Sequence, residues 1–207
     1  VGSGDSGSVI PYLSLVDAQP YYYSVGTSSS DLKSGSPTVT VVAGTATLSS
    51  AQPNNVGVGD IILAGGVNYR IMARSSSTSY TVGDDSFRMP TDIGATSVTS
   101  IKRAYNSISS AISGTAQDLV TNGVQLNLVL YNDDEEIIKG GQFEETPNVT
   151  GYTTSASNYI HIYSATTNEA GASQRHHGIT TGAVRIEPTS LGGNNYIMQI
   201  DEDYVRV

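Results

Sequence analysis

The sequence contains no cysteine and no tryptophan among its 207 residues, and only 14% of the residues are charged. Without cysteine, a disulfide framework, a thiolate zinc site and an iron–sulfur cluster are all excluded. The 10 Lys and Arg are outnumbered by 19 Asp and Glu. This balance argues against nucleic acid and anionic membranes as partners, because both require a basic surface. No apolar run reaches the roughly 18 residues that a membrane-spanning helix needs, so we expect no membrane span.

Glycine, serine, threonine and tyrosine are abundant instead, with 22 Gly and 13 Tyr. This composition is typical of exposed β-strands that are joined by hydroxyl-rich turns. Tyrosine gives a strand an apolar body and a polar tip, which suits a sheet face that meets water or another chain. We therefore expect an extracellular or cell-surface protein. The sequence starts at Val1 without a methionine or a leader, as a processed secreted chain would.

Residues 1–19 are predicted to form a flexible extension that carries a candidate donor strand. Residues 1–8 are rich in Gly and Ser, a composition typical of flexible linkers. The apolar segment 9–16 includes Pro11, which argues against a central position in a sheet. We assign an assembly role to its side chains and to the tyrosines of the next extended piece, namely Val9, Ile10, Tyr12, Leu13, Leu15, Val16, Tyr21, Tyr22 and Tyr23.

Residues 20–98 are predicted to form a small β module. Apolar and polar side chains alternate within 38–49 on both sides of Gly44, as two half-buried strands require. Further short strands are predicted at 61–63, 67–72 and 79–82. The short spacing favours an antiparallel meander, a small barrel or a sandwich, and does not choose among them.

Residues 99–117 are predicted to form a helical connector, with the helix over 101–112. The apolar residues that recur there at the spacing of one helix face are Ala104, Ile108, Ala111 and Ile112. Gly114 is a suitable C-terminal stop. This is the only helix that the sequence predicts.

Residues 118–207 contain short alternating segments, which lie at 125–131, 158–163, 182–186, 195–200 and 204–207. Apart from Asn122 and Gly123, no tight hairpin signal joins them. Strands with similar faces and no hairpin turns suit the coils of a parallel β-solenoid, although the period is irregular. The predicted fold is therefore all-β: a small N-terminal β module, one short helix and a short right-handed parallel β-helix.

Several sequence segments resemble the opening coils of right-handed parallel β-helix surface proteins with the pectate-lyase-like fold. These segments are residues 115–133, 151–165, 173–178 and 196–207. The segments 20–35, 54–82 and 100–114 resemble the module that precedes such β-helices in mostly uncharacterised secreted proteins of environmental bacteria and archaea. The resemblance contains no catalytic signature. In that family the last strand runs on into further coils, whereas this sequence stops at Val207.

The densest charge run is acidic, and its members Asp133, Asp134, Glu135 and Glu136 are weak candidates for calcium ligands. These four residues are consecutive, whereas the ligands of a calcium loop are spaced along the chain, so a solvated acidic loop is the better interpretation. The adjacent His176 and His177 would point to opposite sides of an extended chain, which makes a poor metal pair. We expect no cofactor, and the sequence leans toward a protein without catalysis.

The sequence favours assembly with copies of itself. Its last segment, 204–207, is an apolar strand with no polar cap after it, and an uncapped strand edge invites another chain. The assembly residues expected there are Tyr204, Val205 and Val207. Segment 9–16 can complete a neighbour's sheet by strand addition, and head-to-tail contacts of that kind propagate into filaments. The alternative for 9–16 is packing on its own domain.

The expected function is thus a non-catalytic extracellular structural subunit of a filament or surface appendage. One alternative is a β-helix that binds or cleaves glycans, as a polysaccharide lyase or a tailspike-like adhesin, with surface glycans as its partners. Such a site would need stacked carboxylates and basic residues, and the scattered 10 Lys and Arg support it weakly. Another alternative is a spacer domain of a larger adhesin.

Overall fold

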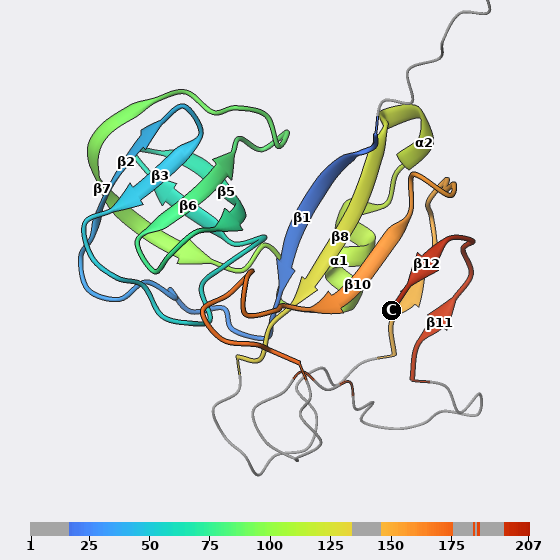
Figure 1. The fold of residues 1–207 in the computed structure, drawn as a ribbon. Helices are drawn as coiled ribbons and strands as arrows, with labels where there is room; N and C mark the ends of the chain where they lie inside the picture. Colours follow the sequence, from blue (N-terminus) through green and yellow to red (C-terminus); the bar gives the residue numbers. More distant parts are fainter. Residues whose placement is uncertain (1–16, 134–145, 176–183, 185, 187–196) are drawn as a thin grey trace, which may run out of the picture.

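The computed structural model describes residues 17–133, 146–175, 184, 186 and 197–207 (Figure 1). These residues form a closed β-barrel and, beside it, a parallel sheet that is packed against two short helices (Figure 1). The donor segment 9–16 lies outside the described residues.

The barrel closes six antiparallel strands in the order β2-β3-β6-β5-β4-β7. Their bounds are β2 Thr38–Val42, β3 Thr45–Leu48, β4 Ile61–Ala64, β5 Val67–Arg74, β6 Ser79–Gly83 and β7 Ile93–Lys102. The predicted strands of this region are confirmed, and of the three arrangements left open the chain adopts the barrel. Inward side chains alternate with outward ones, so Val39 and Val41 are buried while Thr38 and Thr40 are partly exposed.

Four parallel strands form the second unit, in the order β1-β8-β10-β12. They are β1 Gln19–Val25, β8 Val124–Leu130, β10 Ile160–Ser164 and β12 Val205–Arg206. A separate parallel pair joins β9 Asn148–Val149 to β11 Gln199–Ile200. The barrel is inserted in the chain between β1 and its partner β8, so β1 lies in the parallel sheet although its residues precede the barrel (Figure 1).

The helices are α1 Ile108–Thr115 and α2 Leu119–Asn122. Helix α1 begins after Ser107, whose side chain accepts from the backbone of Ser110 in a capping box. The helix predicted over 101–112 is therefore correct only in its second half. The start of the first half belongs to the barrel strand β7 instead, because Ile101 at the end of that strand is buried opposite Ile62.

The expected fold of a β module, one helix and a right-handed parallel β-helix is wrong. The described residues contain two helices rather than one, and the β module is a closed barrel. The parallel strands form one sheet of four and one of two rather than clear stacked coils. A physical reason lies in the core: the inner face of β8 packs on Ile108, Ala111 and Ile112 of α1, which occupy the space beneath the sheet.

Candidate functional site

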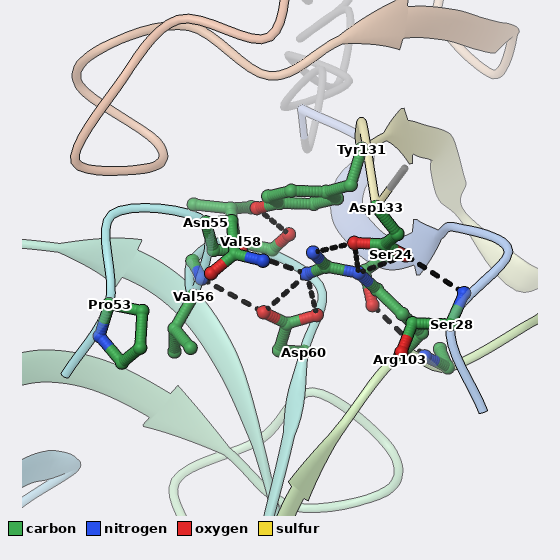
Figure 2. A network of polar contacts seen from close by, with 12 residues as sticks. Ser24, Ser28, Pro53, Asn55, Val56, Val58, Asp60, Arg103, Tyr131 and Asp133 are labelled. Atoms are coloured by element: carbon green, nitrogen blue, oxygen red, sulfur yellow. Dashed lines mark hydrogen bonds and ion pairs between the residues drawn. The ribbon is translucent and has the colours of Figure 1, made fainter. Parts of the chain in front are cut away.

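A buried ion triad joins the barrel to the parallel sheet. Arg103 follows β7, Asp60 precedes β4 and Asp133 follows β8, and all three side chains are almost fully buried. Figure 2 shows the guanidinium between the two carboxylates, with Nη1 2.8 Å from both oxygens of Asp60 and Nη2 2.5 Å from Asp133 Oδ1. The Tyr131 ring covers the guanidinium, with its centroid 3.8 Å from Cζ. The triad fixes the two units to each other.

The electrostatics of the triad follow from burial. Burial raises the pKa of Asp60, and Arg103 together with a hydrogen bond from Gly57 opposes this rise. Burial alone would lower the pKa of Arg103, but Asp60 and Asp133 raise it well above the ordinary value. Arg103 therefore stays charged at any pH at which the protein folds. This cation, held between two buried carboxylates, is a structural contact between the barrel and the parallel sheet.

Aromatic contacts close the β1 side of the sheet against the barrel. Tyr21 stacks on Phe87 with ring centroids 4.4 Å apart, and Tyr23 meets the same ring edge-on at 5.2 Å. Arg70 of β5 lies over the Tyr23 ring at 5.1 Å. Tyr21 and Tyr23, which we expected at an assembly contact, thus pack on their own chain, whereas Tyr22 points to the other face of the sheet.

The outer edge of β1 is blunted. Gln19 N donates to Gly123 O, so the backbone groups of Gln19 point toward β8. In a parallel ladder the backbone groups of successive residues point to alternate sides, so those of Pro20 point away from β8. Proline has no N–H to offer an incoming strand, a known protection of edges. At the other end of β1, Ser24 O accepts from Tyr105 N at 3.0 Å. Pro20 and the bond to Tyr105 thus remove two of the backbone groups that β1 would otherwise offer to another chain.

At the opposite edge of the sheet, β12 has one strand neighbour among the residues that the structure describes. Ile160 N donates to Tyr204 O, so Val205 directs its own N–H and C=O away from β10 by the same alternation. Within the described residues, no strand pairs with this outer side of β12. Tyr204 is 54% exposed and Val207 is 75% exposed, while Val205 is half-buried against the sheet core. The three expected assembly residues therefore lie together at an unpaired edge.

The same end of the molecule concentrates exposed apolar surface. Of the large hydrophobic side chains that are exposed in the described part of the chain, half lie in its last segment, 197–207. They are Ile197, Ile200, Tyr204 and Val207. A local group of exposed apolar side chains beside a bare strand edge is typical of an interaction surface rather than of scattered surface residues.

The outer face of the sheet carries polar and aromatic side chains. One row crosses all four strands at paired positions and consists of Tyr22, Asn127, His161 and Arg206. The His161 ring stacks on Tyr163 at 4.2 Å, and Arg206 lies over the Tyr159 ring at 3.8 Å. Burial and then Arg206 lower the pKa of His161, which is therefore neutral at pH 7. Rings, amides and a cation share this face.

The acidic run does not form a metal site where the structure describes it. Asp133, its first member, is occupied by Arg103 and by the backbone N–H of Ser28. Asp134, Glu135, Glu136, His176 and His177 lie outside the described residues. In the described ranges no three His, Asp or Glu side chains gather in a way that would hold a metal ion.

Sequence reasoning missed the triad. Arg103 and Asp60 are 43 positions apart, and only Asp60 is an isolated charge, because Lys102 precedes Arg103. The one available signal was the scarcity of charge, because an isolated charge inside an apolar pattern is often paired when buried. Arg103 stood instead within a predicted helix, where it would have been assigned to the solvent side.

None of the helices among the described residues is long and apolar enough to span a membrane. No protein-family model, no curated protein and no solved structure matches the chain. The resemblance to β-helix surface proteins therefore stays a prediction, and the function has to be argued from the geometry of the chain itself.

Proposed function

We propose that this chain is a non-catalytic extracellular structural subunit that assembles with copies of itself, head to tail, into a filament or surface appendage. The observation that carries the proposal is the asymmetry of the parallel sheet. Its β1 edge carries Pro20 and lies against the barrel, whereas no strand of the described part of the chain pairs with the outer side of β12, which is apolar. If only the β12 edge of a subunit can accept a strand, the strand that pairs with it must come from a different element of the next copy. Segment 9–16 is our candidate for that strand.

The energetics favour strand addition as the joint. An added strand makes several ladder hydrogen bonds, each worth about 0.5–1.5 kcal/mol net. Each large apolar side chain that becomes buried adds about 1.5–3 kcal/mol. Because the donor belongs to one copy and the bare edge to the next, the contact is heterologous, and repetition produces an open polymer. The rigid junction at Arg103 would transmit load between successive joints.

Deletion of residues 1–18 tests this function. The deletion stops before β1, so the barrel and the sheet keep their described contacts. We expect the full chain to form polymers in negative-stain microscopy and light scattering, and the deleted chain to stay monomeric with an unchanged melting temperature. A synthetic peptide of residues 1–18 should shorten the polymers by occupying bare edges. Monomers in both forms at high concentration would show that the proposal is wrong.

A second candidate function is binding of surface glycans on the outer sheet face. The observation that favours it is the group Tyr22, His161 and Arg206 on one face, flanked by the rings of Tyr159 and Tyr163. Aromatic faces can stack on the apolar faces of sugar rings, and a cation beside them can hydrogen-bond to sugar hydroxyls.

Affinity electrophoresis through soluble polysaccharides tests the second candidate. The informative variant is Tyr159→Ala, matched by Met89→Ala at an exposed barrel site. Retardation that Tyr159→Ala abolishes and Met89→Ala preserves would support glycan binding. Unsaturated-product absorbance from polygalacturonate with Ca²⁺ would instead indicate a lyase and contradict the non-catalytic assignment.

A further inference from the structure

Two apolar rows cross the inner face of the parallel sheet and stop at its open edge. The first row pairs Leu126 with Ile160 and Ile160 with Val205. The second pairs Leu128 with Ile162, and one further step of the same register brings Val207 beside Ile162. The members on β8 and β10 are buried, whereas Val207 is 75% exposed. Among the described residues, each row therefore ends at the last strand of the sheet, and the second row ends on an exposed side chain.

A hollow lies where the second row stops. It has a volume of about 510 Å³, and its lining includes Leu130, Ile162, Arg175, Val184, Ile186 and Val207. Its apolar floor continues the core of the sheet, because Ile162 and Leu130 belong to that core. Side chains entering from a further strand would bury this surface.

The N-terminal segment has the pattern that such a strand needs. Successive side chains of a strand point to opposite faces, so Leu13 and Leu15 share one face and Ser14 takes the other. This matches β12, where Val205 and Val207 share a face on either side of Arg206. The charges also match: residues 1–20 contain two Asp and neither Lys nor Arg, whereas Arg175 and Arg206 lie at the acceptor.

The length of the connection requires a second copy. Leu15 precedes Gln19, the first residue of β1, by four residues, which span at most about 14 Å in a fully extended chain. A strand on the outer side of β12 lies four strand spacings from β1, about 19 Å at roughly 4.8 Å each. Leu15 therefore cannot reach the open edge of its own sheet.

We infer that residues 13–15 of one copy pair with the outer edge of β12 of a second copy. Leu13 and Leu15 continue the two apolar rows, and Ser14 lies beside Arg206 on the polar face. This inference rests on the proposed assembly and specifies its joint. Each copy donates residues 13–15 and accepts at β12, so no copy closes on itself.

Disulfide trapping tests the joint with little background, because the chain has no cysteine of its own. Leu15→Cys and Val207→Cys variants are purified separately, mixed, oxidised and separated by non-reducing electrophoresis. The matched control replaces Leu15→Cys by Ser14→Cys, one residue away on the opposite face. Disulfides need Cα atoms about 4.4–6.8 Å apart and converging Cβ atoms, so we expect about tenfold more heterodimer from Leu15→Cys than from the control.

The outcomes separate the joint from the assembly. Polymers in the microscope together with a selective link from Leu15→Cys support both. Polymers without that link, or with equal links from Ser14→Cys, overturn the inferred joint while the assembly stands. Absence of polymers in the parent chain overturns the proposed function itself. A link that forms within one chain carrying both Leu15→Cys and Val207→Cys, at high dilution, would overturn the length argument.

Discussion

Nη1 of Arg103 lies 2.8 Å from both carboxylate oxygens of Asp60, and neither side chain reaches solvent to any useful extent. Replacement of the cation by Arg103→Leu would leave Asp60 and Asp133 buried side by side without a counter-charge. We expect a loss of about 3–5 kcal/mol in the free energy of unfolding, the usual cost of breaking a buried pair. Urea unfolding followed by circular dichroism measures it.

Asp60→Asn is the matched variant for that measurement. Because burial raises the pKa of Asp60, the folded protein holds a proton there more tightly than the unfolded chain does. The charged carboxylate therefore lowers stability as pH rises through the folded pKa, and the neutral amide removes that penalty. We expect Asp60→Asn to cost clearly less than Arg103→Leu at pH 7. Equal losses would contradict this assignment of roles.

Gly59 is predicted to be intolerant of any side chain. Its φ is 91°, and an added Cβ would lie 2.2 Å from the backbone nitrogen of Ser24 in β1. Gly66 has a similar φ of 79° but nothing within 4 Å of such a Cβ. Gly66→Ala should therefore cost only the backbone strain of about 1–2 kcal/mol. Gly59→Ala should lower the melting temperature much further, because β1 must move away from the barrel.

Tyr152 is expected to stay protonated far into the alkaline range. Its hydroxyl lies 2.8 Å from Thr115 Oγ1 and donates to Ile112 O at 2.9 Å. Burial is the main cause that raises its pKa to about 12. Since the folded pKa exceeds the unfolded value of 10.0, the stabilisation is complete below pH 10 and is lost as pH rises from 10 to 12.

Ultraviolet titration of the tyrosines, compared with Tyr152→Phe, measures this effect. Burial raises the pKa of other tyrosines too, so the wild-type protein should show one more tyrosine that ionises near pH 12 than the variant does. The difference in unfolding free energy between the two proteins should shrink above pH 10. A normal titration of all tyrosines in the folded protein would contradict the prediction.

Two barrel tyrosines are expected to respond in opposite ways to loss of the hydroxyl. The hydroxyl of Tyr69 is buried without a hydrogen-bond partner among the described residues, whereas that of Tyr80 donates to Ser77 O at 3.1 Å. An unpaired buried polar group costs about 1–3 kcal/mol, and a made hydrogen bond contributes about 1 kcal/mol. Tyr69→Phe should thus raise stability and Tyr80→Phe lower it, as thermal unfolding would measure.

The barrel strands other than β7 could be predicted because their signals are local. In the β2–β3 hairpin, the alternating residues and the turn at Ala43 and Gly44 lie within one short stretch. Both turn residues have positive φ, 46° and 74°, as the tight turns that match strand twist require. Closure into a barrel depends on the pairing of β2 with β7, which no local pattern contains.

The parallel sheet was harder to predict because its contacts are distant in sequence. The alternation of β8 is visible, yet nothing in it indicates that β1 is its neighbour rather than a further coil. The apolar face of α1 was recognised, but not that it would lie beneath β8 through Ile108 and Ile112.

The insertion of the barrel between β1 and β8 has a consequence for synthesis. The amide of Asn127 donates to Tyr21 O across 106 positions, so β1 leaves the ribosome long before its neighbour exists. At about 5–20 residues per second, the interval is roughly 5–20 s, ample time for a small barrel to fold first. The nascent chain would then contain a folded barrel preceded by the tyrosine-rich strand β1, which has no partner strand yet. At this stage a chaperone would have the most exposed strand to protect.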